Sequence, residues 1–569
     1  MKKSHFIQLL FLKNWALSTR FSQLMKGRVR QIYVALGLSV IFSILATELS
    51  VAQTQAKQKS ETNFDQALTN GKAANEAFRH SHRYLLGWLS KADPVSGLIP
   101  RNLTKDTCIW NAWDAAADNY PFMVMTAAML DRPIFEGKMR DMLATETRLS
   151  SRIGRLPDTY SFCKRGFQND QIDTSQVVFG SAEYMKDGLI PLTEWLGQSP
   201  WSERMLGILE DLNKIVEVPT EIKSVGLGNH AVVEVGGDLL QVLARMYWQT
   251  RNPKWLRWGI QIGDYYLSPD HLPTRALTRL RLRDHGCEIV SGLVELYAVV
   301  SIFDPGKKKQ WQPYIHEMLN TILANGRNAD GLFYDEINPI TGEIIQKRLA
   351  DNFGYTLNAF YTVYMIDHVV TYREATLKAL GSLSPHYRNH DWESGSADGY
   401  ADAIEGTLNL YLREPVASTK DWLDSEIKVL YNFQKADGII EGWHGDGNFA
   451  RTSLMYALWK TAGIHISNWN ADVVYGAVTE KNNVYVTITS ATAWAGKLIF
   501  GSKWHVDHMN MPVDYPRINQ FQEWFPIEKD KNYKLTNGSK SLTVKGSSLI
   551  DGYPVQLKAN EVVRLSCAR

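Results

Sequence analysis

Residues 239–247, LLQVLARMY, place apolar side chains at the spacing of one helix face. The same i, i+3/i+4, i+7 pattern recurs at 289–300, 357–366 and 404–411, and turns rich in Gly, Pro and Asp separate the segments. The region from about 62 to about 467 is therefore predicted to be a series of helices, roughly ten to twelve at ordinary helix and loop lengths.

A weak internal repeat indicates how these helices are arranged. Four segments carry an Asp before a Gly and an apolar pair: 93–99 (DPVSGLI), 187–190 (DGLI), 330–333 (DGLF) and 437–440 (DGII). Asp-Gly is a tight-turn signal, and the apolar pair after it would enter a core. The repeat predicts helical hairpins stacked around a common centre, and its irregular spacing favours a closed ring over a strict solenoid.

The C-terminal part of the chain has a different pattern. Residues 484–489 (VYVTIT), 497–500, 541–544 and 561–565 are rich in β-branched residues and alternate in polarity, and Asn537-Gly538 is a hairpin-type turn. We therefore expect a catalytic helical domain at 53–470 and a smaller, β-sandwich-like domain at 471–569.

The N-terminus has the pattern of an export signal. Residues 1–30 contain Lys and Arg but no Asp or Glu, and 32–46 is almost wholly apolar. Ser50 and Ala52 supply the small residues that a signal peptidase reads, so 1–52 is predicted to be removed. The apolar run is shorter than the ~20 residues of a spanning helix. We expect a secreted or periplasmic protein with no membrane span in the mature chain; an uncleaved anchor is the alternative.

Composition excludes several classes of protein. Lys+Arg 62 against Asp+Glu 60 leaves a net charge of +2, which predicts no nucleic-acid partner. The 18 Trp and 25 Tyr residues suit stacking against sugar rings. The four cysteines form no CxxC pair and allow three disulfide connectivities. P-loop, nucleophile-elbow, HExxH and dinucleotide-binding motifs are absent, so neither a cofactor nor a metal is predicted.

The strongest candidate for chemistry is an acidic helix. At 100° per residue, Asp398, Asp402 and Glu405 share one face, and no Lys or Arg follows four residues later to relieve their repulsion. Crowded carboxylates raise one another's pKa, so one of them can serve as a proton donor at neutral pH. A solvated acidic face and a calcium site are the alternatives. Trp392 lies in the Gly/Ser-rich loop before the helix and would form a cleft rim.

Other polar segments supply further candidates. His285 and Glu288 share a helix face and would act as acid or base, and Asp351 would lie near the reacting bond. The guanidinium groups of Arg283, Arg348 and Arg451 would hold a substrate carboxylate. The remaining predicted substrate contacts are Asn229, His230, Tyr355, Trp443, His444 and Trp110. For most of these, helix capping or core packing is the competing interpretation.

Three segments resemble exported carbohydrate-active enzymes built on an (α/α) toroid with a C-terminal β-domain. They are 399–406 (GYADAIEG), 444–452 (HGDGNFART), and 514–517 (DYPR) with 523–525 (EWF). That group contains exo-acting uronic-acid glycosidases, unsaturated glucuronyl hydrolases, and heparinase- or alginate-lyase-type enzymes. The resemblance implies a mainly α fold, an (α/α)6-type toroid of helical hairpins followed by an all-β domain. It also implies an oligo- or polysaccharide substrate.

Two reactions follow from that resemblance. In the hydrolases a pair of carboxylates acts, and here one of Asp402, Glu405 and Glu288 would be the general acid. In the lyases an Asn, a His and a Tyr neutralise the uronate and abstract a proton, and Asn229, His230 and Tyr355 would be the parallels. We expect a glycoside hydrolase that acts at the end of a uronic-acid-containing glycan. A polysaccharide lyase and a non-catalytic glycan-binding protein are the alternatives.

Overall fold

The computed structural model describes residues 29–216 and 229–569, with side chains described from residue 58 onward except at 217–231, 284 and 285. The chain divides into a segment ending at Asp65 and a compact unit, Gln66–Arg569; helix α2 (Val29–Leu89) runs through the division. The predicted export signal at 1–52 lies outside the residues described with their side chains. Among the described residues, none of the helices combines the length and apolar character needed to cross a membrane.

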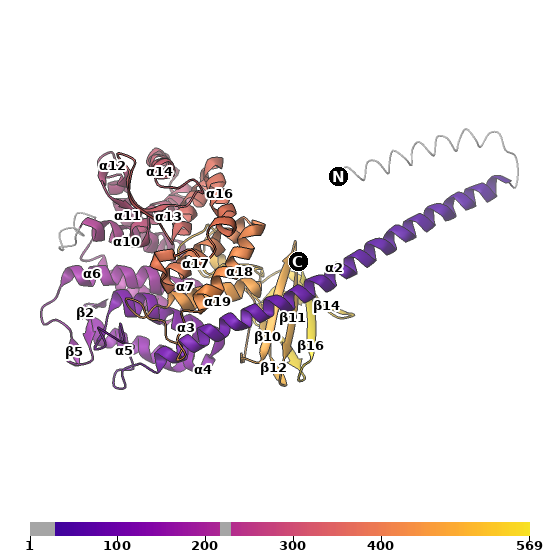
Figure 1. The fold of residues 1–569 in the computed structure, drawn as a ribbon, viewed down its shortest axis with the longest axis horizontal. Coiled ribbons are helices and arrows are strands. Elements are labelled where there is room, and N and C mark those ends of the chain that lie inside the picture. Colours follow the sequence, from indigo (N-terminus) through magenta and orange to yellow (C-terminus); the bar gives the residue numbers. More distant parts are fainter. Residues whose placement is uncertain (1–28, 217–228) are drawn as a thin grey trace. The chain divides into compact units, whose positions relative to one another are not determined.

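Helices of the compact unit form a closed ring (Figure 1). Helices α10, α13, α15, α17 and α19 each contact the next, α19 contacts α3, and η1 and η3 connect α3 back to α10. The inner elements are η1 (Ala112–Asn119), α3 (Tyr120–Leu130), α6 (Thr174–Glu183), η3 (Tyr184–Leu189), α7 (Ile190–Leu196), α10 (Asn229–Thr250), α13 (Glu288–Phe303), α15 (Phe353–Asp367), α17 (Ala397–Arg413) and α19 (Asn448–Lys460). This arrangement confirms the predicted toroid of helical hairpins.

A second set of helices packs outside the ring. They are α5 (Arg140–Ser150), α8 (Pro200–Leu212), α11 (Pro253–Tyr266), α14 (Pro305–Asn325), α16 (Val370–His386) and α18 (Ala417–Tyr431). Helices α11, α14, α16 and α18 each contact the inner helix that precedes them. Short turns complete the helical part: α4 (Arg132–Ile134), η2 (Phe135–Met139), α12 (Pro273–Ala276), η4 (Asp284–Cys287) and η5 (Trp392–Ser394).

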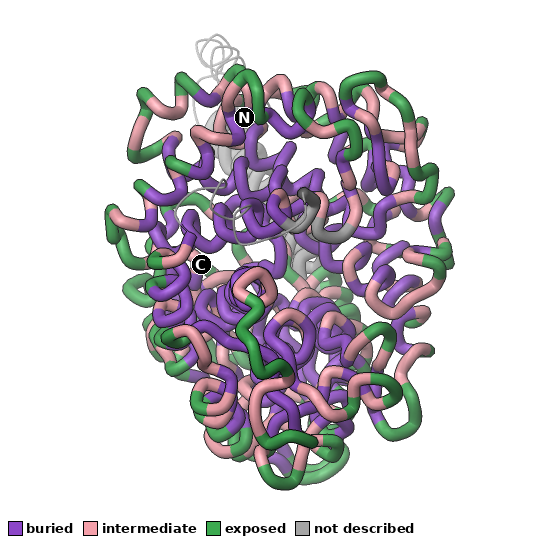
Figure 2. The backbone as a smooth tube through the Cα atoms, turned by 90° about the vertical axis from the view of Figure 1, so that its left-hand side faces the viewer, coloured by how far each residue is buried: buried purple, intermediate pink, exposed green. Residues whose placement is uncertain are grey.

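The core lies where the inner helices meet. Figure 2 shows buried residues concentrated toward the interior and exposed residues in the peripheral turns. Nearly all of the side chains of α13 up to Val300 are buried, which matches its almost continuous apolar sequence. Backbone packing is close between α15 and α17, where Gly354 faces Gly406. This close approach places Tyr355 of α15 against the acidic residues of α17.

Three of the four Asp-Gly segments form the predicted turns. Gly97, Gly331 and Gly438 have positive φ values of 74°, 95° and 90°. A glycine adopts this left-handed conformation without the steric cost that a Cβ would add. The fourth segment differs, because Gly188 lies inside η3 and the helix continues through it.

The strands after the ring form two antiparallel sheets. One has the order β10 (Val473–Glu480), β11 (Asn483–Ser490), β16 (Val562–Ala568), β13 (Asn532–Asn537) and β14 (Lys540–Lys545). The other has the order β15 (Tyr553–Leu557), β12 (Trp494–Ile499) and β9 (His465–Ile466). Helical turns α20 (Trp504–Asp507) and α21 (Gly546–Ile550) accompany them. The predicted all-β C-terminal region is therefore present, and the boundary at 470 stays a prediction.

Within the ring, loops carry short antiparallel strands. They are β1 (Ile109–Trp110) with β4 (Tyr160–Ser161) and β5 (Gly166–Phe167); β2 (Ser151–Ile153) with β3 (Leu156–Pro157); and β6 (Leu280–Arg281) with β7 (Tyr334–Asn338) and β8 (Glu343–Leu349). A disulfide joins Cys108 to Cys163 beside the first of these sheets. Cys287 and Cys567 are buried and keep their thiols, so the even set of cysteines forms one bridge.

A segment between β12 and β13, residues 500–531, reaches from the β region to the inner helices. The Asn409 amide on α17 donates to the carbonyl of Arg517 at 2.9 Å, and Arg245 on α10 donates to the carbonyl of Ile518 at 3.0 Å. Two helices far apart in the sequence thus bind neighbouring carbonyls of one segment. This segment forms part of the candidate site.

Candidate active site

A cavity of about 620 Å³ opens at one end of the ring and is rich in carboxyl groups. Its acidic lining consists of Asp114, Asp118, Glu183, Asp187, Glu288, Glu393, Asp398, Asp402, Glu441 and Asp446. The cationic side chains among its described lining are Arg101, Lys186, Lys435 and Arg451, with His444 beside them. The cavity is therefore an acidic, partly desolvated compartment.

Arg451 ties together the acidic face of α17. Its Nη2 lies 2.7 Å from Asp402 Oδ1 and 2.9 Å from Glu405 Oε2. The Tyr355 hydroxyl donates to the same two carboxylates at 2.9 Å and 2.5 Å. Glu405 is fully buried beneath the cavity wall, where burial raises its pKa and Arg451 opposes that shift. The acidic face is neutralised from α19 and α15, not by a cation on its own helix.

A second network lies across the cavity. The Lys186 ammonium is 2.8 Å from Asp187 Oδ1 and 2.5 Å from Glu288 Oε1. The Gln241 amide donates to Glu288 Oε2 at 2.5 Å. Burial raises the pKa of Glu288 to about 6, although Lys186 favours its ionised form. Asp187 also accepts a hydrogen bond from Asn519 Nδ2 at 2.9 Å. Two donors thus stabilise Asp187 as a carboxylate.

The environment of Asp118 differs from that of Asp187, because it favours the protonated form of the carboxyl group. Burial raises its pKa to about 8, and repulsion from Asp187, Asp114 and Asp446 outweighs the attraction of His444. The nearest charged nitrogen among the described residues is His444 Nε2, 3.6 Å from Asp118 Oδ2. At neutral pH Asp118 is therefore a protonated acid that faces the cavity.

Two further carboxyl groups lie near the Gly-rich loop before α19. Burial raises the pKa of Asp446 to about 6, while His444 and the backbone N–H of Asn448 favour its ionised form. Burial and neighbouring carboxylates raise the pKa of Asp398, which accepts a hydrogen bond from Asn448 Nδ2 at 2.8 Å. Of these two groups, Asp446 raises the pKa of Asp118 by electrostatic repulsion.

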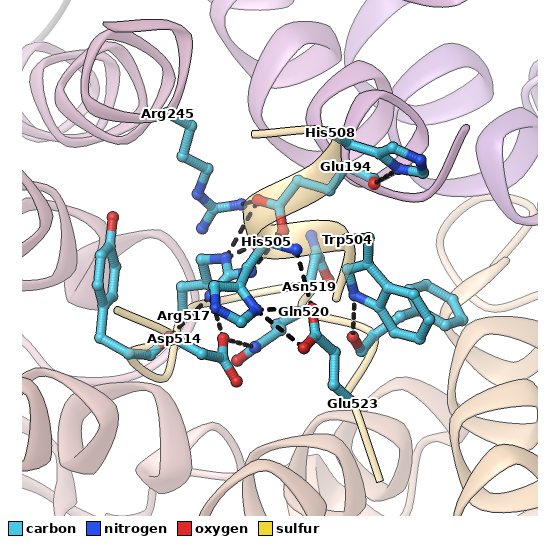
Figure 3. Close-up of polar contacts among 12 residues, drawn as sticks. Glu194, Arg245, Trp504, His505, His508, Asp514, Arg517, Asn519, Gln520 and Glu523 are labelled. Atoms are coloured by element: carbon cyan, nitrogen blue, oxygen red, sulfur yellow. Dashed lines mark hydrogen bonds and ion pairs between the residues drawn. The ribbon is translucent and has the colours of Figure 1, made fainter. Parts of the chain in front are cut away.

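Two sets of described side chains have ligand atoms close enough to hold a metal ion. Asp114, Asp118 and His444 line the cavity, but Arg101 already donates to Asp114 Oδ2 at 2.5 Å. The second set, His505, Asp514 and Glu523, appears in Figure 3. There Arg413 and Arg517 both pair with Asp514. These guanidinium groups oppose a further cation in each set.

Six of the residues predicted from the sequence line the cavity. They are Glu288, Tyr355, Asp402, Trp443, His444 and Arg451. Trp443 is 71% exposed, and Lys105 lies over its ring with Nζ 4.9 Å from the centroid. An exposed indole at the rim of a cavity is well placed to stack on a sugar.

Other predicted residues lie elsewhere. Trp110 and Trp392 are buried in the core, and Asp351 is buried away from the cavity lining. Glu405 lies behind the wall. Arg283 and Arg348 line a separate depression of about 700 Å³ on the β6–β8 sheet. The side chains of Asn229, His230 and His285 lie outside the described residues.

Four lining residues that matter for the site were not predicted as site residues. Asp118 follows a Trp-rich segment, and Lys186 and Asp187 occur in the segment interpreted as a turn. Residues 181–187, SAEYMKD, contain neither Gly nor Pro and could have indicated that the side chain of Asp187 lies on a helix. Asn519 carried no local signal, because only the folded chain brings it to the cavity.

Comparisons with known proteins found solved structures of low similarity to this chain. No protein-family model matches the chain, and no curated protein matches its sequence. A family 76 α-1,6-mannanase from Salegentibacter sp. HEL1_6 is 13% identical with a TM-score of 0.39, over 55% of this chain and 96% of that one. A family 76 glycoside hydrolase (mannosidase) from Bacteroides thetaiotaomicron is 10% identical with a TM-score of 0.36, over 67% and 98%.

A third solved structure has a different activity. Cellobiose 2-epimerase from Bacillus thermoamylovorans is 10% identical with a TM-score of 0.36, over 49% of this chain and 87% of that one. At these TM-scores the likeness fixes neither the reaction nor the substrate of this chain.

Proposed function

We propose that the protein is a glycoside hydrolase in which Asp118 is the general acid and Asp187 is the partner carboxylate. One observation carries this proposal: two carboxyl groups of one cavity have opposite surroundings, because Asp118 lies among other carboxylates and Asp187 lies against the Lys186 ammonium and the Asn519 amide. Burial keeps Asp118 protonated, with a pKa of about 8, whereas Lys186 and Asn519 stabilise Asp187 as an anion. Titratable pairs whose environments separate them in this way are typical of acid/base catalysis on glycosides.

The proposed reaction follows from these two states. Asp118 donates its proton to the glycosidic oxygen as the bond from that oxygen to the anomeric carbon breaks. If the reaction inverts the anomeric carbon, Asp187 accepts a proton from the water molecule that attacks this carbon. If it retains the configuration, Asp187 attacks the anomeric carbon itself, and the carboxylate of Asp118 then accepts the proton of the water that releases the sugar from Asp187. The separation of the two carboxyl groups with substrate bound decides between inversion and retention.

The form of the cavity supports action at a chain end. Trp443 is exposed at its rim, whereas Ile518 and Asn519 line it and are almost wholly buried. A cavity closed at its base by the C-terminal segment accommodates a terminal sugar more readily than the middle of a chain.

The position of an acidic sugar is part of this proposal. The cations of the cavity are paired with carboxylates: Arg101 with Asp114, Lys435 with Glu441, Lys186 with Asp187 and Glu288, and Arg451 with Asp402. The reacting subsite therefore offers carboxylate acceptors to sugar hydroxyls. We place recognition of a uronate in the depression that Arg283 and Arg348 line. These two groups also pair with Asp335, but the described lining of the depression contains four arginines and only two carboxylates, so positive charge is in excess there.

The loop that contains Glu393 and Ser394 lies between the cavity and the depression and supports that placement. Arg283 Nη1 donates to Glu393 Oε1 at 2.6 Å, and Arg348 Nη1 donates to Ser394 Oγ at 3.0 Å. Glu393 also lines the cavity, so a glycan that leaves the cavity over this loop would next meet the two guanidinium groups. Glu393 and Ser394 both have positive φ values, 46° and 59°, a strained conformation that is frequent at functional sites.

The lyase alternative has weaker support. The Tyr355 hydroxyl already donates to Asp402 and Glu405, and burial raises its pKa well above the ordinary value. A phenolate base is therefore disfavoured at this position.

The Cys108–Cys163 disulfide supports our proposal that the protein is exported, because disulfides persist in oxidising compartments.

A panel of end-labelled oligosaccharides, with neutral and uronic-acid-containing members, tests the function. Hydrolysis adds the mass of one water to the products, whereas elimination adds none and creates an ultraviolet-absorbing double bond. Asp118→Asn and Asp187→Asn should each abolish turnover, while Asp530→Asn, at a side chain 97% exposed in the β region, should not. Near-full turnover in both cavity variants would show that this pair does not carry the reaction.

A further inference from the structure

Asn519 connects the C-terminal segment to the charged groups of the cavity. It belongs to the segment between β12 and β13, yet it lines the cavity and is only 3% exposed. Figure 3 shows it beside the buried network that holds this segment against the ring.

Three polar groups of Asn519 have a partner of the matching kind. Its backbone N–H donates to Glu405 Oε1 at 2.7 Å, and its Nδ2 donates to Asp187 Oδ1 at 2.9 Å. Its Oδ1 accepts from Arg451 Nη1 at 2.7 Å. Donors face the two carboxylates and the acceptor faces the guanidinium, so this network fixes the orientation of the amide. One residue thus binds groups on η3, α17 and α19.

The backbone around Asn519 is held in place on both sides. Before it, the Arg517 guanidinium binds Glu194 through Nε and Nη2, with Nη2 2.8 Å from Oε2. After it, the Trp504 indole donates to the carbonyl of Phe521 at 3.1 Å. Asn519 itself has a φ of 59°. Asn adopts this left-handed conformation more readily than most side chains, so the position favours Asn on backbone grounds as well.

We propose that Asn519 is a positioning residue of the candidate site, which keeps Asp187 ionised and in place from outside the helical ring. This inference rests on the proposed function for the role of Asp187 but adds that the C-terminal segment completes the site. Among the side chains that the structure describes, the charged groups that act on Asp187 are Lys186 next to it, Glu183 on α6, Asp118 on η1 and Glu288 on α13. Lys186 is the one cation in that set, and Asn519 supplies the second donor.

Two variants separate the side chain from the backbone. Asn519→Gly keeps the left-handed backbone and the N–H to Glu405 but removes the amide. Asn519→Asp keeps the shape but places an acceptor against Asp187. Both should lower kcat/KM by about ten- to hundredfold, as expected for a lost hydrogen bond to a charged group. The acidic limb of the pH–rate profile should move to higher pH, because Asp187 then binds its proton more tightly.

Asn560 provides the matched control. It also has a positive φ, 62°, and is exposed in the β region away from the cavity. Asn560→Gly and Asn560→Asp should leave both kcat/KM and the profile unchanged. An Asn519 variant with the wild-type profile, whether fully active or uniformly weakened at every pH, would overturn the positioning role.

Thermal unfolding across pH tests the same inference without a substrate. Asn519 favours the ionised form of Asp187, so the loss of stability in Asn519→Asp should be large near pH 7 and shrink as acid protonates Asp187. A loss of equal size at every pH would overturn the inference. A pH-dependent loss in a protein that hydrolyses no glycan would uphold the contact and reject the proposed function.

Discussion

Gly354 on α15 and Gly406 on α17 face each other so closely that a Cβ added to Gly354 would lie 2.5 Å from the Gly406 Cα. No side chain can occupy this crossing without separating the two helices. The crossing holds Tyr355 within hydrogen-bond distance of Asp402 and Glu405, so helix packing here sets the geometry of the cavity wall.

Gly406→Ala should therefore destabilise the fold by about 1–3 kcal/mol, the usual cost of overpacking a core. The measurement is denaturant unfolding followed by circular dichroism. Gly381→Ala is the matched control, because Gly381 is also helical and a Cβ there meets nothing within 4 Å. The control should be neutral or slightly stabilising, since Ala is the better helix former. Equal losses in both variants would contradict the packing argument.

Asp118→Asn should remove the general acid and lower kcat by about 10²–10⁴-fold. In the wild type, activity should fall as pH rises through about 8, because Asp118 then loses the proton that it donates. Steady-state rates between pH 5 and 9 provide the test. A basic limb that persists unchanged in residual Asp118→Asn activity would assign that limb to another group.

The same substitution should raise stability. Folding raises the pKa of Asp118 from its ordinary value of 3.8 to about 8, so its contribution is favourable at low pH and is lost as pH rises through 8. An amide stays neutral and avoids that loss. The melting temperature of Asp118→Asn should exceed that of the wild type by a margin that grows from about pH 4 toward pH 8. A constant margin would contradict the raised pKa.

Lys186→Met should destabilise the protein by about 3–5 kcal/mol, because it leaves the buried carboxylates of Asp187 and Glu288 without their cation. The pKa of Glu288, about 6 in the wild type, should rise further in the variant. The stability deficit should therefore widen as pH rises above 6 and narrow below it. Urea unfolding at several pH values measures this, and a deficit independent of pH would reject the electrostatic explanation.

Removal of the disulfide should cost about 2–4 kcal/mol. Cys108→Ser with Cys163→Ser is the variant, and calorimetry is the measurement. The wild type treated with a reductant serves as the control and should melt at the same temperature as the variant. If the reductant leaves the wild-type melting temperature unchanged while the variant melts lower, the loss comes from packing of the new serines.

Much of the fold could be predicted because its signals are local. The 3.6-residue periodicity of segments such as 289–300 gives helices, and the alternation at 484–489 gives β11. The Asp-Gly repeat correctly predicted that the helices close into a ring. One of its four members was interpreted wrongly, because Asp187-Gly188 lies within η3 and is not a turn between helices. There the π-helical turn absorbs the glycine and leaves the carboxylate directed at Lys186.

The candidate site was less predictable because its partners come from distant segments. The helical wheel correctly grouped Asp398 and Asp402, which line the cavity, but it included Glu405, which is buried. No Lys or Arg on α17 lies four residues after these acids, yet Arg451 supplies the opposing charge from α19. The burial of Asp118 and the position of Asn519 in the cavity lining depend on the tertiary structure. Residue spacing along the chain therefore does not predict them.

Because residues 500–531 extend from the β region into the ring, truncated and chimeric forms of this chain would have an altered cavity. A fragment that stops after α19 would lack Ile518 and Asn519, the two described lining residues of the cavity that follow this helix. Glu405, Asp187 and Arg451 would then each lose a hydrogen-bond partner. A chimera that takes its β portion from another protein would likewise place a different residue at the position of Asn519 in the cavity lining. The segment 500–531 is thus a region where differences in selectivity between helical toroids with a C-terminal β region would be expected.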